Sequence, residues 1–303
     1  MTRSRRCSAT SLALLGIVLA AALPAHAGPL PAWAFAYGAA PIALEGSMHD
    51  AGDGTRRGIF TYASGERTQV VEIVAPANAA SPGPGLLFVH WLGDAATTNH
   101  TEFEADAIAL AKRGATSVLL DAMWSTVANK GADWYDSIRS TRTDYADSIR
   151  QVVDLRRALD VLLAQPNIDP ERIAYVGHDF GSMYGAVLAG VDARPRFYVL
   201  MAGTTTFSQW YLYGKKPANV AAFVKQMAPL DPLAYLARSK AQAYLFQFSA
   251  HDQFVTPAQA AEFAAASPLP RGVFTYDADH SLAIPQARAD RLAWLEEHLY
   301  APK

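Results

Sequence analysis

Residues 173–183 read Ile-Ala-Tyr-Val-Gly-His-Asp-Phe-Gly-Ser-Met, and this stretch decides the fold. An apolar run typical of a strand buried on both faces leads into Gly-x-Asp-x-Gly and then into a helical pattern over 182–189. This is the form of a nucleophile elbow, a sharp and strained turn between strand and helix. The residues two before and two after its apex must be small, and Gly177 and Gly181 meet that requirement. The sequence therefore places Asp179 at the apex.

An aspartate at this position changes the chemistry that the elbow supports. The common residue there is Ser, which needs a base to become a nucleophile. An Asp side chain, with an ordinary pKa of about 3.9, is already ionised at neutral pH. Attack by Asp179 on carbon would give an ester bound to the protein, and a base would be needed only to activate water in a second step.

The elbow predicts where its partners lie, because such chains carry the nucleophile, then an acid, then a His. His280 follows the predicted strand 273–276, and we expect it to be the base. Asp252 follows the predicted strand 243–248, and we expect its carboxylate to orient the imidazole. The rival candidates for that acid are Asp231, Asp277 and Asp279.

Backbone amides should hold the negative charge that develops on oxygen during the reaction. One donor should be the N–H of Phe180, directly after the nucleophile. The second should follow the strand 86–89, where we expect the N–H of Trp91. Side chains that are candidates to line a substrate pocket are His90, Trp124, Trp134, Tyr184, Trp210 and Tyr211. Aromatic packing explains Trp124 and Trp134 equally well, and His90 is expected to fix the shape of its loop. Tyr184, Trp210 and Tyr211 are also candidate hydrogen-bond donors to a leaving group.

Strand-like and helix-like segments alternate on both sides of the elbow. Such alternation favours a mostly parallel sheet with helices on both faces, so we expect one three-layer α/β domain over 58–303. Residues 28–57 lack a regular pattern, and the aromatic-rich stretch 204–240 breaks the rhythm and is expected to be a small lid. The expected strands are 58–63, 68–75, 86–89, 117–120, 172–176, 197–201, 243–248 and 273–276, and the expected helices are 102–113, 144–163, 182–189, 257–266 and 287–299.

The alternation, the elbow and the late acid and His resemble the α/β-hydrolase superfamily. The residues flanking the elbow (176–185) and the short 204–240 insert resemble the dienelactone-hydrolase-like branch, which implies hydrolysis of esters or lactones. The sequence His-Asp-Phe-Gly at 178–181 is also similar to that of epoxide hydrolases and haloalkane dehalogenases, which use an Asp nucleophile. The dienelactone branch carries Cys or Ser at the apex, whereas the other two groups usually carry Trp or Arg at the position of Phe180.

These two resemblances point to different substrates. An sp³ carbon, as in an epoxide or a haloalkane, would give an ordinary ester with Asp179, whereas an ester or lactone would give a less stable mixed anhydride. The flanking residues favour the dienelactone branch, so the conflict stays open at this stage. A second hypothesis is a non-catalytic binding protein on the same fold.

Composition and the first residues limit the remaining function classes. Residues 1–27 hold three Arg, a 12-residue apolar run and Ala-His-Ala, the layout of a signal peptide, which predicts export to a periplasm or the medium. The full chain has a net charge of −2, and without residues 1–27 the net charge is −5, so a nucleic-acid partner is not expected. Cys7 is the only cysteine and precedes the apolar run. We expect no metal, no cofactor, no stable membrane insertion after cleavage, and a small-molecule substrate.

Overall fold

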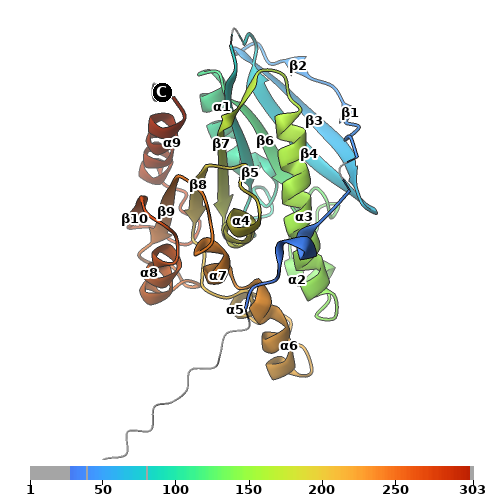
Figure 1. Ribbon diagram of the computed structural model, residues 1–303, viewed down its shortest axis with the longest axis vertical. Coiled ribbons are helices and arrows are strands. Elements are labelled where there is room, and N and C mark those ends of the chain that lie inside the picture. Colours follow the sequence, from blue (N-terminus) through green and yellow to red (C-terminus); the bar gives the residue numbers. More distant parts are fainter. Residues whose placement is uncertain (1–27, 39, 80, 301–303) are drawn as a thin grey trace, which may run out of the picture.

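The computed structural model describes residues 28–38, 40–79 and 81–300, and within these residues ten strands form one sheet (Figure 1). The order across the sheet is β1-β3-β4-β6-β5-β7-β8-β9-β10, and β2 also pairs with β3. The strands are β1 (Glu45–Gly46), β2 (His49–Asp50), β3 (Thr55–Ser64), β4 (Arg67–Pro76), β5 (Gly83–Val89), β6 (Thr116–Asp121), β7 (Ile168–His178), β8 (Phe197–Met201), β9 (Ala243–Ser249) and β10 (Arg271–Tyr276).

The sheet is antiparallel at one end and parallel over the rest. β3 pairs antiparallel with β1, β2 and β4, and β4 pairs antiparallel with β6. From β6 to β10 every neighbouring pair is parallel. All strands of the parallel part therefore end at the same edge, and this edge receives the loops that carry His280, Asp252 and Asp179.

Helices cover both faces of the sheet, as the alternating pattern predicts. Leu87 and Val89 of β5 face one apolar core, whereas Leu86 and Phe88 face the other, so this strand is buried on both sides. α3, α4 and α8 supply the first core, and α1 and α9 supply the second. The helices are α1 (Glu104–Ala111), α2 (Tyr135–Ile138), α3 (Asp144–Leu163), α4 (Phe180–Val191), α5 (Phe207–Tyr211), α6 (Val220–Met227), α7 (Pro232–Leu236), α8 (Pro257–Ala265) and α9 (Pro285–Tyr300), with the 3₁₀ turns η1 (Ala32–Phe35), η2 (His100–Phe103) and η3 (Ala228–Leu230).

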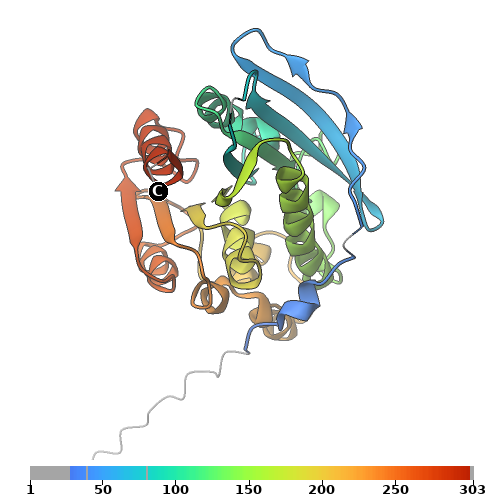
Figure 2. The same ribbon diagram turned by 45° about the horizontal axis from the view of Figure 1, so that its top comes forward.

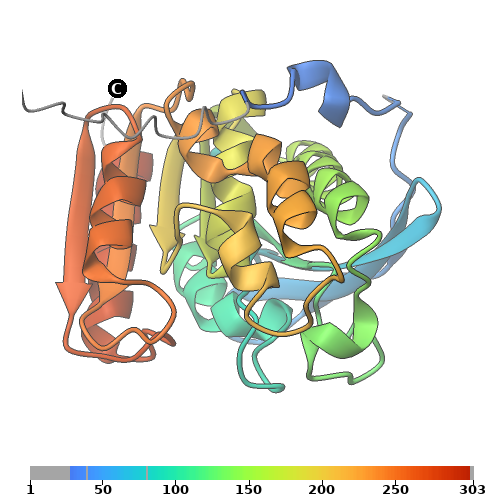
Figure 3. The same cartoon turned by 90° about the horizontal axis from the view of Figure 1, so that it is seen from below.

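The expected lid, residues 204–240, consists of the short helices α5, α6 and α7 with η3 between the last two. Figure 3 shows these helices in orange on the side of the sheet that α3 and α4 cover. α7 packs closely against α4, and buried apolar side chains of the segment, including Phe207 and Met227, belong to the same core as α4. The segment therefore packs into the same apolar core as α4.

Residues 28–57 are more regular than their sequence indicates. They contain η1, β1 and β2, and β3 begins at Thr55, ahead of the expected position 58. η1 packs against α3, and the chain then runs along that helix to the sheet (Figure 2). The predicted signal peptide, residues 1–27, lies outside the described residues. Among the helices that are described, none is both long and apolar enough to cross a bilayer.

Candidate active site

The turn between β7 and α4 has the geometry that an elbow requires. Asp179 has φ 57° and ψ −117°, a backbone conformation that L-residues rarely adopt and that costs on the order of 1–3 kcal/mol. A Cβ on Gly177 would lie 2.4 Å from the carbonyl oxygen of Gly181, and a Cβ on Gly181 would lie 2.2 Å from that of Val89. Both contacts are with backbone, so neither position accepts a larger residue without movement of the strands.

The two carboxylate oxygens of Asp179 have different partners. The N–H of Leu92, in the loop after β5, donates to Oδ2 at 2.9 Å. Nε2 of His280 lies 3.2 Å from Oδ1. The side chain is 8% exposed, so these two contacts orient a nearly buried carboxylate.

His280 is held between two carboxylates. Its Nδ1 lies 2.8 Å from Oδ2 of Asp252, while its Nε2 faces Asp179. Burial alone lowers the pKa of His280, but hydrogen bonds to Asp179 and Asp252, together with their charges, outweigh burial and raise the pKa to about 9. Since both partners are acceptors, both ring nitrogens carry a proton at neutral pH and the imidazole is a cation.

Asp252 is set in place by its own loop. The N–H groups of Phe254 and Val255 donate to Oδ1 at 2.8 and 2.9 Å. Burial raises the pKa of Asp252, but the hydrogen bond and charge of His280 and these amides leave it below its usual value. The rival acids are engaged elsewhere: Asp231 accepts from the N–H of Phe207, Asp277 pairs with His251, and Asp279 accepts from Ser281.

The expected second amide donor, the N–H of Trp91, is wrong by one residue. This N–H donates to Oε2 of Glu102 at 2.6 Å and is therefore unavailable. The next amide along the loop, that of Leu92, faces Asp179 instead. The N–H of Phe180 begins α4 and has no carbonyl of its own helix to bind, which leaves it available at the same place.

Glu102 is a residue of this site that sequence reasoning missed. Its Oε1 lies 2.6 Å from Nδ1 of His178, and the Nε2 of His178 faces the backbone carbonyl of His280 at 3.0 Å. His178 thus lies between a carboxylate oxygen and a backbone carbonyl oxygen, both of which are hydrogen-bond acceptors. The indole of Trp91 stacks on His178, with ring centroids 5.2 Å apart and planes 5° from parallel. One carboxylate therefore links the loop after β5, the elbow and the loop of His280.

A cavity of about 450 Å³ opens beside Asp179 and His280. Trp134 and Trp210 line it as expected from the sequence, and Phe254 approaches His280 edge-on at 4.9 Å. The remaining lining residues are Trp91, Leu92, Gly93, Asp94, Asp133, Phe180, Tyr213, Gln253, Asp279 and Ser281. Several carboxylates thus surround the cavity and His280 is its cation, so an anionic substrate is disfavoured.

Four residues expected in the pocket lie behind it: His90, Trp124, Tyr184 and Tyr211, all buried. His90 accepts from the N–H of Ala122 and donates through Nδ1 to the carbonyl of Trp91 at 2.7 Å, so it shapes the loop. Burial, the largest cause, lowers the pKa of His90 and favours this neutral form. The indole N–H of Trp124 donates to the same carbonyl.

The hydroxyls of Tyr184 and Tyr211 bind each other at 2.7 Å instead of facing the cavity. Ser148 of α3 bridges both hydroxyls, at 2.9 Å from Tyr184 and 2.8 Å from Tyr211, and Tyr135 donates to Tyr211 at 3.2 Å. This hydroxyl cluster joins α3, α4 and α5. Because the two hydroxyls bind each other, they do not face the cavity, and the sequence alone does not reveal this pairing.

The family model of the prolyl oligopeptidase family matches residues 101–300, about two thirds of the chain. The chain belongs to this family. That match spans the elbow, the acid and the His, and the protein is accordingly an α/β-hydrolase and a hydrolytic enzyme. No curated protein sequence gives a significant match.

Solved structures share the fold over most of the chain. An acetyl xylan esterase from Paenibacillus sp. R4 is 17% identical, with a TM-score of 0.69 over 86% of this chain and 90% of its own. Acetyl xylan esterase 1 from Thermoanaerobacterium sp. is 14% identical, with a TM-score of 0.67 over 86% and 88%. A putative dienelactone hydrolase from Klebsiella pneumoniae is 15% identical, with a TM-score of 0.59 over 82% and 99%. At such identities the similarity establishes the fold alone.

The charge of His280 gives a first prediction. In Asp179→Asn one of the two carboxylates is lost, so the pKa of His280 should fall from about 9 toward its ordinary 6.5. Because the folded-state pKa is raised, this group stabilises the wild type fully below about pH 6.5 and loses that contribution as pH rises through about 9. NMR titration of the ring and denaturant unfolding between pH 6 and 10 measure both effects. Asp277→Asn, an exposed charge on the same loop, is the control, and an unchanged pKa in Asp179→Asn would contradict the prediction.

The link through Glu102 gives a second prediction. In Glu102→Gln one of the two acceptor oxygens is replaced by an amide N–H₂ donor, so the hydrogen bond to either the Trp91 amide or His178 should be lost. The loop that presents the N–H of Leu92 should also loosen. Hydrogen exchange of the Trp91 and Leu92 amides measures both effects, and both amides should exchange faster than in the wild type. Glu104→Gln, which removes a partly exposed partner of Arg57, is the matched control. Exchange of both amides at the wild-type rate in Glu102→Gln would refute the structural role of Glu102.

Proposed function

We propose that this hydrolase uses Asp179 as a nucleophile on an electrophilic sp³ carbon, as in an epoxide or a haloalkane. The observation that carries the proposal is the arrangement of one carboxylate: Oδ2 accepts from the N–H of Leu92, while Oδ1 faces His280 beside the cavity. A serine would leave this amide free for an oxyanion of the substrate. With Asp179, the amide already holds the oxygen that becomes the ester carbonyl.

In the first step a carboxylate oxygen of Asp179 forms a bond to carbon, and the leaving group departs with the electron pair of its own bond. A halide leaves as the ion, whereas the alkoxide from an epoxide takes a proton from solvent.

Formation of the ester removes the charge of Asp179 and, with it, one cause of the raised pKa of His280. His280 then releases its proton to solvent and becomes a base oriented by Asp252. It takes a proton from water as the water oxygen attacks the ester carbonyl. The amides of Leu92 and Phe180 hold the resulting oxyanion, and collapse expels the alcohol, which takes the proton from His280. The new carboxyl group returns its proton to the imidazole.

The second candidate is hydrolysis of an ester or lactone, and the comparisons favour it. Two esterases and a putative dienelactone hydrolase share the fold, and none of the comparisons supports an Asp nucleophile. Attack by Asp179 on an ester would expel an alkoxide, a far poorer leaving group than the carboxylate itself. Water activated by a neutral His280 is the more favourable route for such a substrate. Its rate would rise with pH up to about 9, where His280 loses its proton.

The proposal includes the substrate class and the place of action. The acidic side chains at the cavity select a neutral or cationic small molecule, and the aromatic walls select an apolar one. The basic start and apolar run of residues 1–27 support export to a periplasm or the medium.

Trapping the covalent intermediate tests the main proposal. His280→Gln should form the ester on Asp179 but release it far more slowly, because water loses its base. Intact-mass spectrometry after incubation with a panel of epoxides, haloalkanes, esters and lactones should show an adduct that maps to the peptide of Asp179. The double variant His280→Gln/Asp179→Asn should show none. Turnover by the wild type without any adduct in His280→Gln would overturn the covalent route.

Replacing the nucleophile separates the two candidates. Asp179→Ser frees the N–H of Leu92 and creates a Ser–His–Asp arrangement, so hydrolysis of 4-nitrophenyl acetate should rise at least about tenfold over the wild type. Asp179→Asn, which keeps the amide occupied and lacks a hydroxyl, should not show this rise. A wild type that already hydrolyses the ester, with a rate that grows toward pH 9, supports the ester candidate instead.

A further inference from the structure

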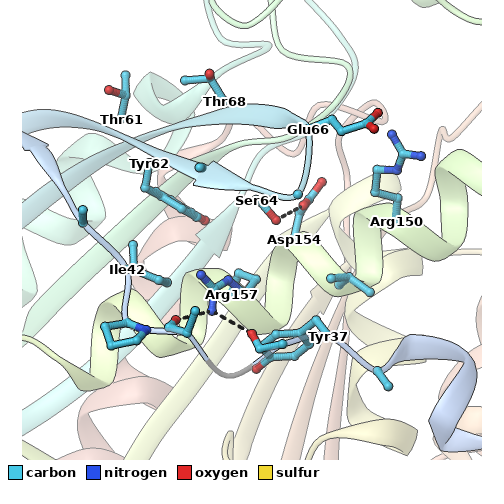
Figure 4. A pocket seen from close by; sticks show the side chains of 18 of the residues that line it. Tyr37, Ile42, Thr61, Tyr62, Ser64, Glu66, Thr68, Arg150, Asp154 and Arg157 are labelled. Carbon is cyan, nitrogen blue, oxygen red and sulfur yellow. Dashed lines mark hydrogen bonds between the residues drawn. The ribbon is translucent and has the colours of Figure 1, made fainter.

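The two ends of the sheet are closed to different degrees. At one end the short strands β1 and β2 pair with β3. The N-terminal segment runs past this end beside a hollow that it forms with the β3–β4 hairpin and α3, and Arg157 of α3 holds it by donating to the carbonyl of Ala40 at 3.1 Å (Figure 4). At the other end β10 pairs with β9 and with no further strand among the described residues (Figure 1). This end therefore presents an open strand edge.

The polar backbone groups of β10 divide between β9 and the outside. The N–H of Tyr244 donates to the carbonyl of Pro270, and the N–H of Ala250 donates to that of Tyr276. Because the backbone groups of a strand alternate in direction from residue to residue, the even-numbered residues of β10 face β9. The N–H and C=O groups that point away from the sheet belong to the odd-numbered residues: Arg271, Val273 and Thr275.

The side chains of β10 leave this edge unprotected. Natural edge strands commonly carry charges, Pro or a bulge that prevents pairing with another chain. After its first residue β10 reads Gly-Val-Phe-Thr-Tyr, with no charge and no proline, and it pairs with β9 without a register shift. Val273 and Phe274 are 48% and 42% exposed. An exposed edge with β-branched and aromatic residues favours the addition of a further strand.

The charges at the two ends of β10 select the strand that can be added. Arg271 begins the strand, and Asp277 follows its end with an exposed side chain. A parallel copy in register would place like charges side by side, whereas an antiparallel copy places Arg271 opposite the partner's Asp277. That register puts Phe274 opposite its own copy and Val273 opposite Thr275. The strand is thus complementary to itself about a two-fold axis at Phe274.

Both charged groups can form this pair. Nη1 of Arg271 donates to the carbonyl of Ser267 at 2.6 Å and to that of Ala265 at 3.4 Å. Oδ1 of Asp277 lies 2.6 Å from Nε2 of His251. Within the described residues, the other two nitrogens of the guanidinium group and Oδ2 of the carboxylate make no hydrogen bond. Each group therefore has atoms left for a partner.

We propose that two copies of this chain associate through β10 in antiparallel orientation, which joins their two sheets into one. The outward backbone groups of Val273 in one copy bind those of Thr275 in the other, once on each side of the two-fold axis. The rings of Phe274 meet at the axis, and the two ion pairs close the ends of the interface. The strand contributes no lining residue to the cavity beside Asp179 and His280, so the association is independent of the proposed function.

Sedimentation equilibrium of the protein tests the association. The wild type should form a dimer with a Kd of about 100 µM or tighter. Val273→Pro removes an outward N–H without taking a hydrogen bond from β9, and proline is tolerated on edge strands, so the fold should persist while Kd rises at least about tenfold. Val273→Thr keeps that N–H and a β-branched side chain, and this matched control should dimerise as the wild type does. A wild type that associates more weakly than this, or a Val273→Pro dimer as stable as that of the wild type, would overturn the proposal.

Disulfide cross-linking tests the register without a proline. In the proposed dimer the two copies of Phe274 form a non-hydrogen-bonded pair with Cα atoms about 4.5 Å apart, whereas the two copies of Thr275 are about 8 Å apart. Phe274→Cys should therefore give a covalent dimer on oxidation. Thr275→Cys, the matched control, should not, because Cα atoms more than about 7 Å apart cannot be bridged. Cys7, the only other cysteine, is replaced by Ser in both variants. Cross-linking of neither variant, or of both at the same rate, would contradict the proposed pairing.

Discussion

The contact of one imidazolium with two carboxylates organises the candidate active site of this protein. His280 neutralises part of the charge of Asp179 and Asp252, which would otherwise repel each other within a largely buried space. The strained backbone of Asp179 brings the carboxylate to that contact, and the two glycines of the elbow make the turn sterically possible. The parallel strands β7, β9 and β10 end at the same edge of the sheet. The loops that follow them carry Asp179, Asp252 and His280, respectively.

Glu102 holds the residues around this arrangement in place through hydrogen bonds. Its two oxygens bind the amide of Trp91 and the ring of His178, and His178 in turn holds the backbone of His280. The carboxylate of Glu102 thereby fixes the loop that presents the N–H of Leu92 relative to the loop that presents the imidazole of His280. The relative positions of Asp179 and His280 therefore depend on a residue from η2, an element that does not line the cavity beside them.

Much of the fold and the three central residues follow from local sequence. An apex flanked by glycines after an apolar strand is compatible with few structures other than an elbow. The order nucleophile, acid, His then limits which residues can be the acid and the His. The amide donor was misplaced by one residue because the choice between Trp91 and Leu92 depends on Glu102, eleven residues away along the chain. Tyr184 and Tyr211 were misplaced for a similar reason, since nothing local indicates that their hydroxyls meet. The regularity of β1 and β2 also depends on pairing with β3, which a two-residue strand does not reveal.

The hydroxyl cluster of Ser148, Tyr184 and Tyr211 has a consequence for how molecules reach the cavity. It ties α5 to α3 and α4, so this helix cannot swing outward without breaking several buried hydrogen bonds at once. The most exposed aromatic side chains that line the cavity are Trp134 and Tyr213, at 61% and 66%, and Tyr213 packs edge-on against Phe254. Because α5 is tied down, the opening of the cavity is bounded by these two rings and not by a helix that can move aside.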